Sequence, residues 1–88
     1  MKVSKSAIIH EVSKELDIDV ALVREVLDAV IVEVVDNLCE KRSVVLQNFG
    51  TFTPFDFPNN LHFGDAKSFL KIAFRPSKNF RRILPKGE

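Results

Sequence analysis

The stretch from Gln47 to Arg82 constrains the fold of this 88-residue chain more than any other part of the sequence. Its first half, Asn48 to Phe52, reads Asn-Phe-Gly-Thr-Phe and predicts a turn between two strands, because Gly50 supplies backbone freedom there. Its second half, Ile72 to Lys78, reads Ile-Ala-Phe-Arg-Pro-Ser-Lys and predicts the end of a strand and a serine-capped helix start. We expect the residues upstream to act as its scaffold.

Two helices are predicted in that upstream part. Apolar residues recur at helical spacing over about residues 4–16, with Ser4 or Ser6 available as the cap of the first helix. The segment Asp17 to Asp19 breaks the pattern, and Asp19 suits the N-cap of a second helix that runs to about Glu40. This second helix carries one apolar stripe, made of Val20, Val23, Leu27, Val30, Ile31, Val34 and Leu38.

The rest of the chain predicts a three-stranded antiparallel sheet and a last helix. Strands are expected over residues 43–47 and 51–57, and alternation over residues 67–75 predicts a third strand with two unlike faces. The face expected to pack on helices holds Leu70, Ile72 and Phe74. The opposite face holds Lys67, Phe69, Lys71, Ala73 and Arg75. The last helix is expected over residues 78–84, and its buried side is formed by Phe80, Ile83 and Leu84.

Size and composition indicate a single folded α+β domain whose core a partner helps to complete. A domain this small buries only about 60% of the surface that its unfolded chain exposes. With 45% hydrophobic residues, the chain is too apolar for a disordered tail. Cys39 is the one cysteine and the first residues lack an apolar run, so the expected location is the cytoplasm. The longest apolar stretch, residues 26–35, is too short and too charged to span a membrane.

Charge is distributed unevenly along the chain. Residues 1–66 hold six Lys/Arg against eleven Asp/Glu, whereas residues 67–88 hold seven Lys/Arg against Glu88 alone. A local cluster of cations attracts a polyanion even when the net charge is only +1, because the attraction is screened within about 10 Å. The alternation of these cations with apolar residues favours a binding surface over the alternative, which is a merely solvated sheet face.

The sequence contains no pattern typical of an enzyme, a metal site or a cofactor site. His10, Cys39 and His62 are not spaced as a ligand set, and no nucleophile motif or glycine-rich phosphate loop is present. We therefore expect a binding protein that has no metal, no cofactor and no small-molecule substrate.

At the two motifs, the sequence resembles the bacterial HU and integration host factor family of small DNA-bending proteins. Its members read much like Gly-Phe-Gly-Thr-Phe and Phe-Arg-Pro-Ser-Lys at these places, and the resemblance covers nearly the whole chain. It implies an intertwined homodimer, with a heterodimer as a further possibility, bound to double-stranded DNA of the nucleoid. It also implies that the aromatic residues near the turn fill a shared dimer core, which here means Phe49, Phe52 and Phe74.

The expected contacts to DNA are phosphate contacts. The free amides at a helix start favour an anion, and the family clamps the DNA backbone with the starts of its first and last helices. Lys5, Arg75 and Lys78 fall at matching positions. The full expected set is Lys2, Lys5, Lys67, Lys71, Arg75, Ser77, Lys78, Arg81 and Arg82. Because none of these contacts reads a base edge, binding should be largely independent of sequence.

One segment departs from the family pattern. Family members carry a long basic arm with an Arg-Asn-Pro tip, but the connection from Phe57 to Lys67 is shorter here and has no Lys or Arg between those two residues. Two interpretations remain: a minor-groove wedge made by Pro58, Leu61 or Phe63, or a compact cap in which Phe55, Phe57, Phe63 and Phe69 cover one another. The missing cations favour the cap and predict reduced bending.

The sequence thus predicts one HU-like domain over residues 1–88, with a helical dimerisation part (1–42), a β-saddle and short arm (43–75), and a C-terminal helix (76–88). The leading hypothesis is a non-enzymatic, histone-like dimer that organises DNA with reduced bending. Two alternatives stay open. One is a protein-interaction module that keeps the HU-like scaffold and uses its phenylalanine-rich hairpin for docking. The other is a helical adaptor that only dimerises.

Overall fold

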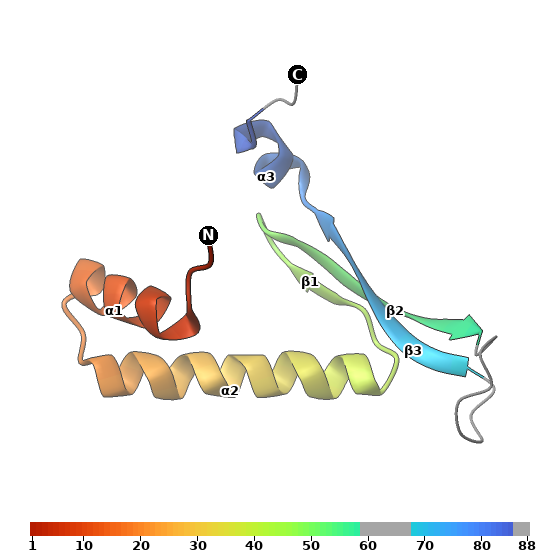
Figure 1. Cartoon of the computed structure of the whole chain (residues 1–88), viewed down its shortest axis with the longest axis horizontal. Coiled ribbons are helices and arrows are strands. Elements are labelled where there is room, and N and C mark those ends of the chain that lie inside the picture. Colours follow the sequence, from red (N-terminus) through yellow and green to blue (C-terminus); the bar gives the residue numbers. More distant parts are fainter. Residues whose placement is uncertain (59–67, 86–88) are drawn as a thin grey trace. The chain divides into compact units, whose positions relative to one another are not determined.

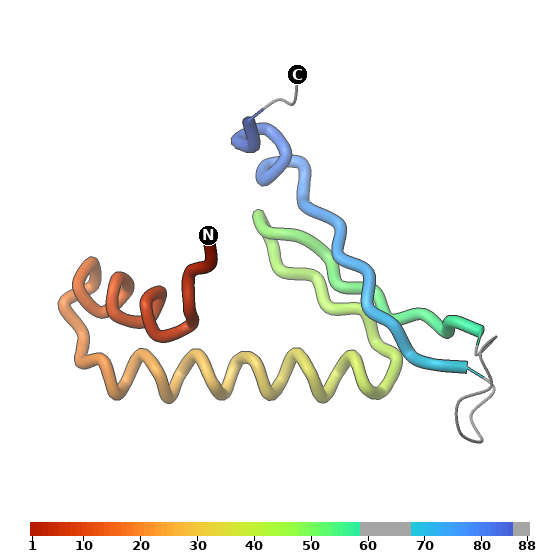
Figure 2. Tube along the Cα trace, in the orientation of Figure 1, coloured from red at the N-terminus to blue at the C-terminus, as the bar shows by residue number. Residues whose placement is uncertain are grey.

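The structure is a computed structural model that describes residues 1–58 and 68–85. Its elements follow in the order α1 (Lys5–Leu16), α2 (Val20–Cys39), β1 (Val44–Leu46), β2 (Gly50–Pro58), β3 (Ser68–Pro76) and α3 (Lys78–Ile83) (Figure 1). The predicted α+β arrangement of two helices, three antiparallel strands and a last helix is confirmed. The chain divides into two compact units, Met1–Glu33 and Val34–Glu88, and continues from one into the other within α2 (Figure 2).

Local hydrogen bonds explain where α1 begins and ends. Ser4 is the N-cap, since its hydroxyl accepts a hydrogen bond from the backbone amide of Ala7 at 3.1 Å. Asp17 ends the helix in the left-handed conformation, with φ of 54°. The following corner is held by the buried Ser13, whose hydroxyl donates to the carbonyl of Ile18 while its own carbonyl accepts from the Ile18 amide. The predicted break between the two helices is therefore confirmed.

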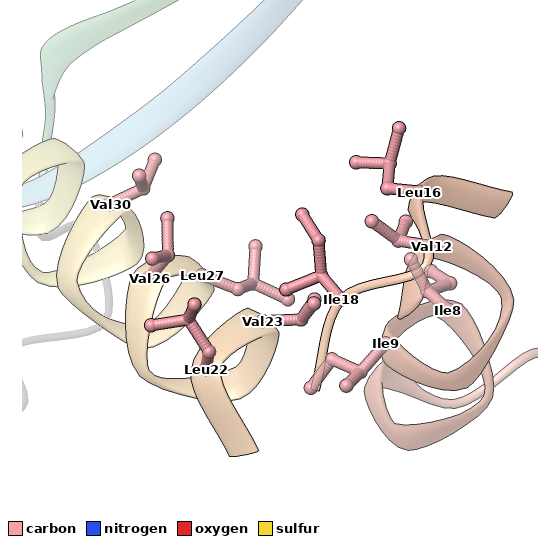
Figure 3. Close-up of a pocket in the computed structure, with 10 residues that line it drawn as sticks. All are labelled: Ile8, Ile9, Val12, Leu16, Ile18, Leu22, Val23, Val26, Leu27 and Val30. Carbon is pink, nitrogen blue, oxygen red and sulfur yellow. The ribbon is translucent and has the colours of Figure 1, made fainter. Parts of the chain in front are cut away.

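The first unit contains an open apolar pocket of about 330 Å³. Ile9 in its lining is fully buried, but most of the other lining side chains keep about half of their surface exposed. Figure 3 shows that α1, the corner and α2 all contribute to the lining, which consists of Ile8, Ile9, Val12, Leu16, Ile18, Leu22, Val23, Val26, Leu27 and Val30. The pocket is thus a hydrophobic surface that the single chain leaves incompletely covered.

The second unit contains the sheet, with strand order β1-β2-β3 and antiparallel pairing throughout. Directly paired residues share a face, and successive residues alternate between faces. One face, which we call the apolar face, holds Val44, Leu46, Phe52, Pro54, Asp56, Leu70, Ile72 and Phe74. The other, which we call the basic face, holds Val45, Thr51, Thr53, Phe55, Phe57, Phe69, Lys71, Ala73 and Arg75. This division agrees with the alternation predicted for the third strand.

The turn between β1 and β2 is formed differently from the expectation. The amide of Phe49 donates to the carbonyl of Leu46 at 3.0 Å, and Asn48 is the residue with positive φ, at 67°. Gly50 already belongs to β2, where a Cβ atom would lie 2.5 Å from the Arg75 carbonyl oxygen and 2.6 Å from the Phe74 ring. The glycine is required for close packing against β3 rather than for backbone freedom in the turn.

Four phenylalanines from the turn, the sheet and α3 form a ring cluster, which consists of Phe49, Phe52, Phe74 and Phe80. The shortest centroid distance is 4.8 Å, between Phe52 and Phe74, and Phe49 stacks on Phe80 at 5.6 Å. The cluster brings together the three residues that were expected in a dimer core and adds Phe80 to them. Phe49 and Phe74 still expose 44% and 40% of their surface in the single chain, so the cluster is only partly covered.

Two expectations about burial stay predictions, because they concern a core that a partner completes and the single chain leaves these side chains exposed. Leu70 and Ile72 on the apolar face remain exposed, although helices were expected to cover them. Ile83 and Leu84 are exposed too, because α3 has only six residues and only Phe80 reaches the ring cluster. Among the described hydrophobic side chains, Ile9 and Leu38 alone are buried. The described part of one chain therefore has very little core of its own.

Candidate nucleic-acid interface

The basic face carries two described cations on β3. Lys71 is paired with Phe55 across the strands, and its Nζ lies 4.0 Å from the centroid of the Phe57 ring, a cation–π contact. Arg75 is paired with Thr51 and is exposed. Among the described residues, no carboxylate lies within ion-pair distance of either side chain. Both cations are therefore available to an external anion.

The junction between β3 and α3 is fixed to the turn by hydrogen bonds. The amide of Ser77 donates to the carbonyl of Phe49 at 3.0 Å, and the side-chain amide of Asn79 donates to Oδ1 of Asn48 at 2.6 Å. Ser77 is also the N-cap of α3, because its hydroxyl accepts from the amide of Phe80 at 3.1 Å. These bonds hold the two cations on either side of the junction, Arg75 and Lys78, on a rigid support.

The short length of α3 affects how an anion is held at its start. A helix of six residues has a small dipole, and the Ser77 hydroxyl already binds one of its free amides. The attraction of this end for phosphate must therefore come mainly from side-chain charge. Three exposed cations of α3 supply it, namely Lys78, Arg81 and Arg82.

The N-terminal cations differ from one another. Nζ of Lys5 forms an ion pair with Oδ1 of Asp28 at 2.7 Å, within the first unit, with both side chains about half exposed. This pair partly neutralises Lys5 and must rearrange before Lys5 binds a phosphate. Lys2 is exposed and makes no ion pair with any described residue. Of the two, Lys2 is the more available cation.

Asp56 is the acidic residue of β2. The register places it on the apolar face, opposite Leu70, and its Oδ2 lies 3.6 Å from Nζ of Lys41. Its charge is therefore directed away from the basic face, which has no acidic residue among its described members.

The described residues offer no sign of a metal or membrane site. Within residues 1–58 and 68–85, no three His, Cys, Asp or Glu side chains are grouped so that they could hold a metal ion. None of the helices described here is long and apolar enough to cross a membrane.

The family assignment rests on the sequence of the N-terminal part of the chain. Residues 3–56 match the family described as bacterial DNA-binding protein, over α1, α2, β1 and most of β2. This match covers more than half of the chain. The chain belongs to the HU family. It is thus a histone-like member of a family of nucleoid-associated DNA-binding proteins.

A solved structure extends the HU likeness beyond the matched residues. A point mutant of HU from Thermotoga maritima superimposes with a TM-score of 0.73 over 91% of this chain and 96% of the other, at 18% sequence identity. At this identity the likeness shows the fold. No curated protein sequence matches the chain.

Several residues predicted from the HU pattern lie outside the described part of the chain. These are Lys67, predicted at DNA, and Leu61 and Phe63, predicted as wedge residues. Pro58, the third wedge candidate, is the last residue of β2. The roles of all four remain predictions.

The sequence reading missed two residues of the basic face. Phe55 and Phe57 were assigned to a hairpin cap, whereas the register places them on the same face as Lys71 and Arg75. The strand period identifies them, because alternate residues of a strand point to the same face. Phe55 and Phe57 are separated from Thr51 by an even number of positions, and Thr51 pairs with Arg75 on the basic face.

Proposed function

We propose that this HU-family chain binds double-stranded DNA, largely without regard to sequence, and organises it without catalysing a reaction. The observation that carries the proposal is the set of unpaired cations Lys71, Arg75 and Lys78 on and beside a face that has no described carboxylate. Cations in such an arrangement bind phosphates and release counterions, which supplies most of the affinity for DNA in sequence-independent binding. Lys2, Lys5, Ser77, Arg81 and Arg82 complete the proposed contact set.

The proposed active species is a homodimer. The described part of one chain buries only two hydrophobic side chains, while the pocket of the first unit, the apolar face and the ring cluster are each incompletely covered. Covering such surfaces is the main source of stability for a small domain, so a second copy is the simplest completion. A DNA-organising dimer of this kind would reside on the nucleoid in the cytoplasm.

The salt dependence of DNA binding tests the proposal. Two 30-base-pair duplexes of unrelated sequence are titrated with the full chain by fluorescence anisotropy at several salt concentrations. If six to ten phosphates are contacted, affinity should fall by about 10³- to 10⁵-fold between 50 and 200 mM salt. Both duplexes should bind with the same affinity within a few fold. Failure to bind either duplex at low salt would refute the proposal. That result would favour the protein-interaction module, which is also consistent with the exposed phenylalanines on β2 and β3.

A second expectation is that the bend in bound DNA is modest. Residues 58–66 contain no Lys or Arg, so this segment brings little positive charge to a phosphate. Unstacking a base step costs a few kcal/mol, and this cost is normally offset by the contacts that a wrapped duplex gains. Without such contacts, a nearly straight complex should be favoured.

Fluorescence energy transfer between the two ends of a duplex measures this bend. We expect a small rise in transfer on binding, and similar affinity for an intact and a gapped fragment. A large bend on intact DNA that Pro58→Ala or Phe63→Ala abolishes would contradict the expectation and identify a working wedge.

A further inference from the structure

Three phenylalanines on the basic face remain partly exposed and are not part of the ring cluster. Phe55, Phe57 and Phe69 each expose about two fifths of their surface, at 41%, 42% and 41%. They lie apart from the ring cluster, and none makes a ring–ring contact with another described ring. No ring–ring contact supports the expected cap among these three, and its fourth member, Phe63, lies outside the described residues. Exposed rings gathered on one face are a typical feature of a binding surface.

The register places these rings among the cations of the same face. Phe57 is paired with Phe69, and Phe55 is paired with Lys71, whose Nζ lies over the Phe57 ring. Arg75 lies on the same face, four residues after Lys71 on β3. Two residues of a strand rise by roughly 7 Å, so Phe55 and Phe57 present separate rings along one line. The surface thus alternates flat apolar rings with positive charge.

The chemistry of this surface identifies its occupant. Cations without nearby carboxylates attract a chain of phosphates, and exposed rings stack on flat aromatic groups that carry no charge. A single-stranded nucleic acid offers both, because its bases are free to stack. The bases of an intact duplex are already stacked on one another and present only their edges in the grooves. A protein partner would need acidic side chains to use the cations as well as the rings.

We propose that the basic face binds single-stranded DNA by stacking unpaired bases on Phe55, Phe57 and Phe69, while Lys71 and Arg75 hold its phosphates. The stacking of bases on the rings goes beyond the proposed duplex binding. The phosphate contacts rest on that proposed function, because Arg75 serves both. Each stacked base adds roughly fivefold or more to affinity. The protein should therefore bind an unstructured single strand more tightly than the charge contacts alone allow.

The first test compares Phe57→Leu/Phe69→Leu with the wild type on fluorescein-labelled (dT)20 and on a 20-base-pair duplex. Leucine keeps the apolar surface and removes the ring, so docking of a protein would survive the change. We expect binding to (dT)20 to weaken by at least about tenfold and binding to the duplex to weaken much less, because the variant keeps the charges of Lys71 and Arg75. Ile83→Ala, which removes an exposed apolar side chain from α3, is the control and should change neither affinity.

The second test uses the absence of Trp and Tyr from the chain. Phe57→Trp introduces a single fluorophore at the proposed stacking position and keeps an aromatic ring there. Its emission should be quenched when (dT)20 binds, and its affinity should match or exceed that of the wild type. Val32→Trp, on an exposed position of α2 in the first unit, is the matched control and should show no quenching.

The outcomes separate the two proposals. Equal binding of (dT)20 by the wild type and the double leucine variant would overturn the stacking proposal, and so would unquenched emission of Phe57→Trp in saturating (dT)20. Either result would leave duplex binding intact and assign the rings to a protein partner instead. If the wild type failed to bind the duplex but still bound (dT)20 with quenching of Phe57→Trp, the proposed function would be refuted and the stacking proposal would stand.

Discussion

Phe52→Ala is expected to lower the free energy of unfolding by about 3 kcal/mol and to weaken dimerisation with it. Phe52 lies 4.8 Å from Phe74 and 6.2 Å from Phe49, measured between ring centroids, so its removal opens a void in the ring cluster. Loss of a large ring from a packed site costs about 3–5 kcal/mol because surrounding side chains refill the space only in part. If the cluster belongs to a core shared by two protomers, folding and association are lost together.

Thermal unfolding followed by circular dichroism at several protein concentrations measures both effects. The wild-type melting temperature should rise with concentration, and Phe52→Ala should melt far lower at each of them. Phe57→Ala is the matched control, because Phe57 lies on the same strand but on the basic face and outside the ring cluster. We expect it to cost less than about 1 kcal/mol. A wild-type chain that sediments as a folded monomer at micromolar concentration would contradict the dimer.

The elements of the fold could be predicted because their signals are local. Apolar spacing defines α1 and α2 to within one or two residues, since a helix places residues three and four apart on one side. Alternation along β3 separates Leu70 and Ile72 from Lys71 and Arg75 before any partner strand is known. The caps Ser4 and Ser77 were predictable for the same reason, because a cap binds an amide only three residues away.

Features that depend on contacts between distant residues could not be read from the sequence. Lys5 and Asp28 are 23 positions apart, and nothing local indicates that Lys5 is paired. The role of Gly50 depends on how closely the Arg75 carbonyl and the Phe74 ring approach it, which only the strand register determines. The placement of Phe55 and Phe57 beside Lys71 follows from the same register. The exposure of Ile83 depends on the short length of α3 and on what packs against it, which helical spacing does not reveal.

Replacing Arg75 and Lys78 with alanine is expected to cause the largest loss of DNA affinity among double substitutions in the described part of the chain. The two residues flank the junction that Ser77 and Asn79 tie to the turn, so both cations have a fixed support and neither is paired with a described carboxylate. Each phosphate contact that is lost reduces the slope of log affinity against log salt by about one unit. In a dimer the substitution removes four cations, and the slope should therefore fall by up to about four units.

The matched control is Lys14→Ala/Arg24→Ala, which changes the net charge equally but acts on the helices of the first unit. Binding isotherms over a series of salt concentrations should show a reduced slope for the first variant and a nearly unchanged slope for the control. The loss should be equal for duplexes of unrelated sequence, because phosphate contacts carry no base information. Equal slopes for the two variants would mean that net charge alone attracts DNA. In that case the junction of β3 and α3 would not be the place where the backbone is held.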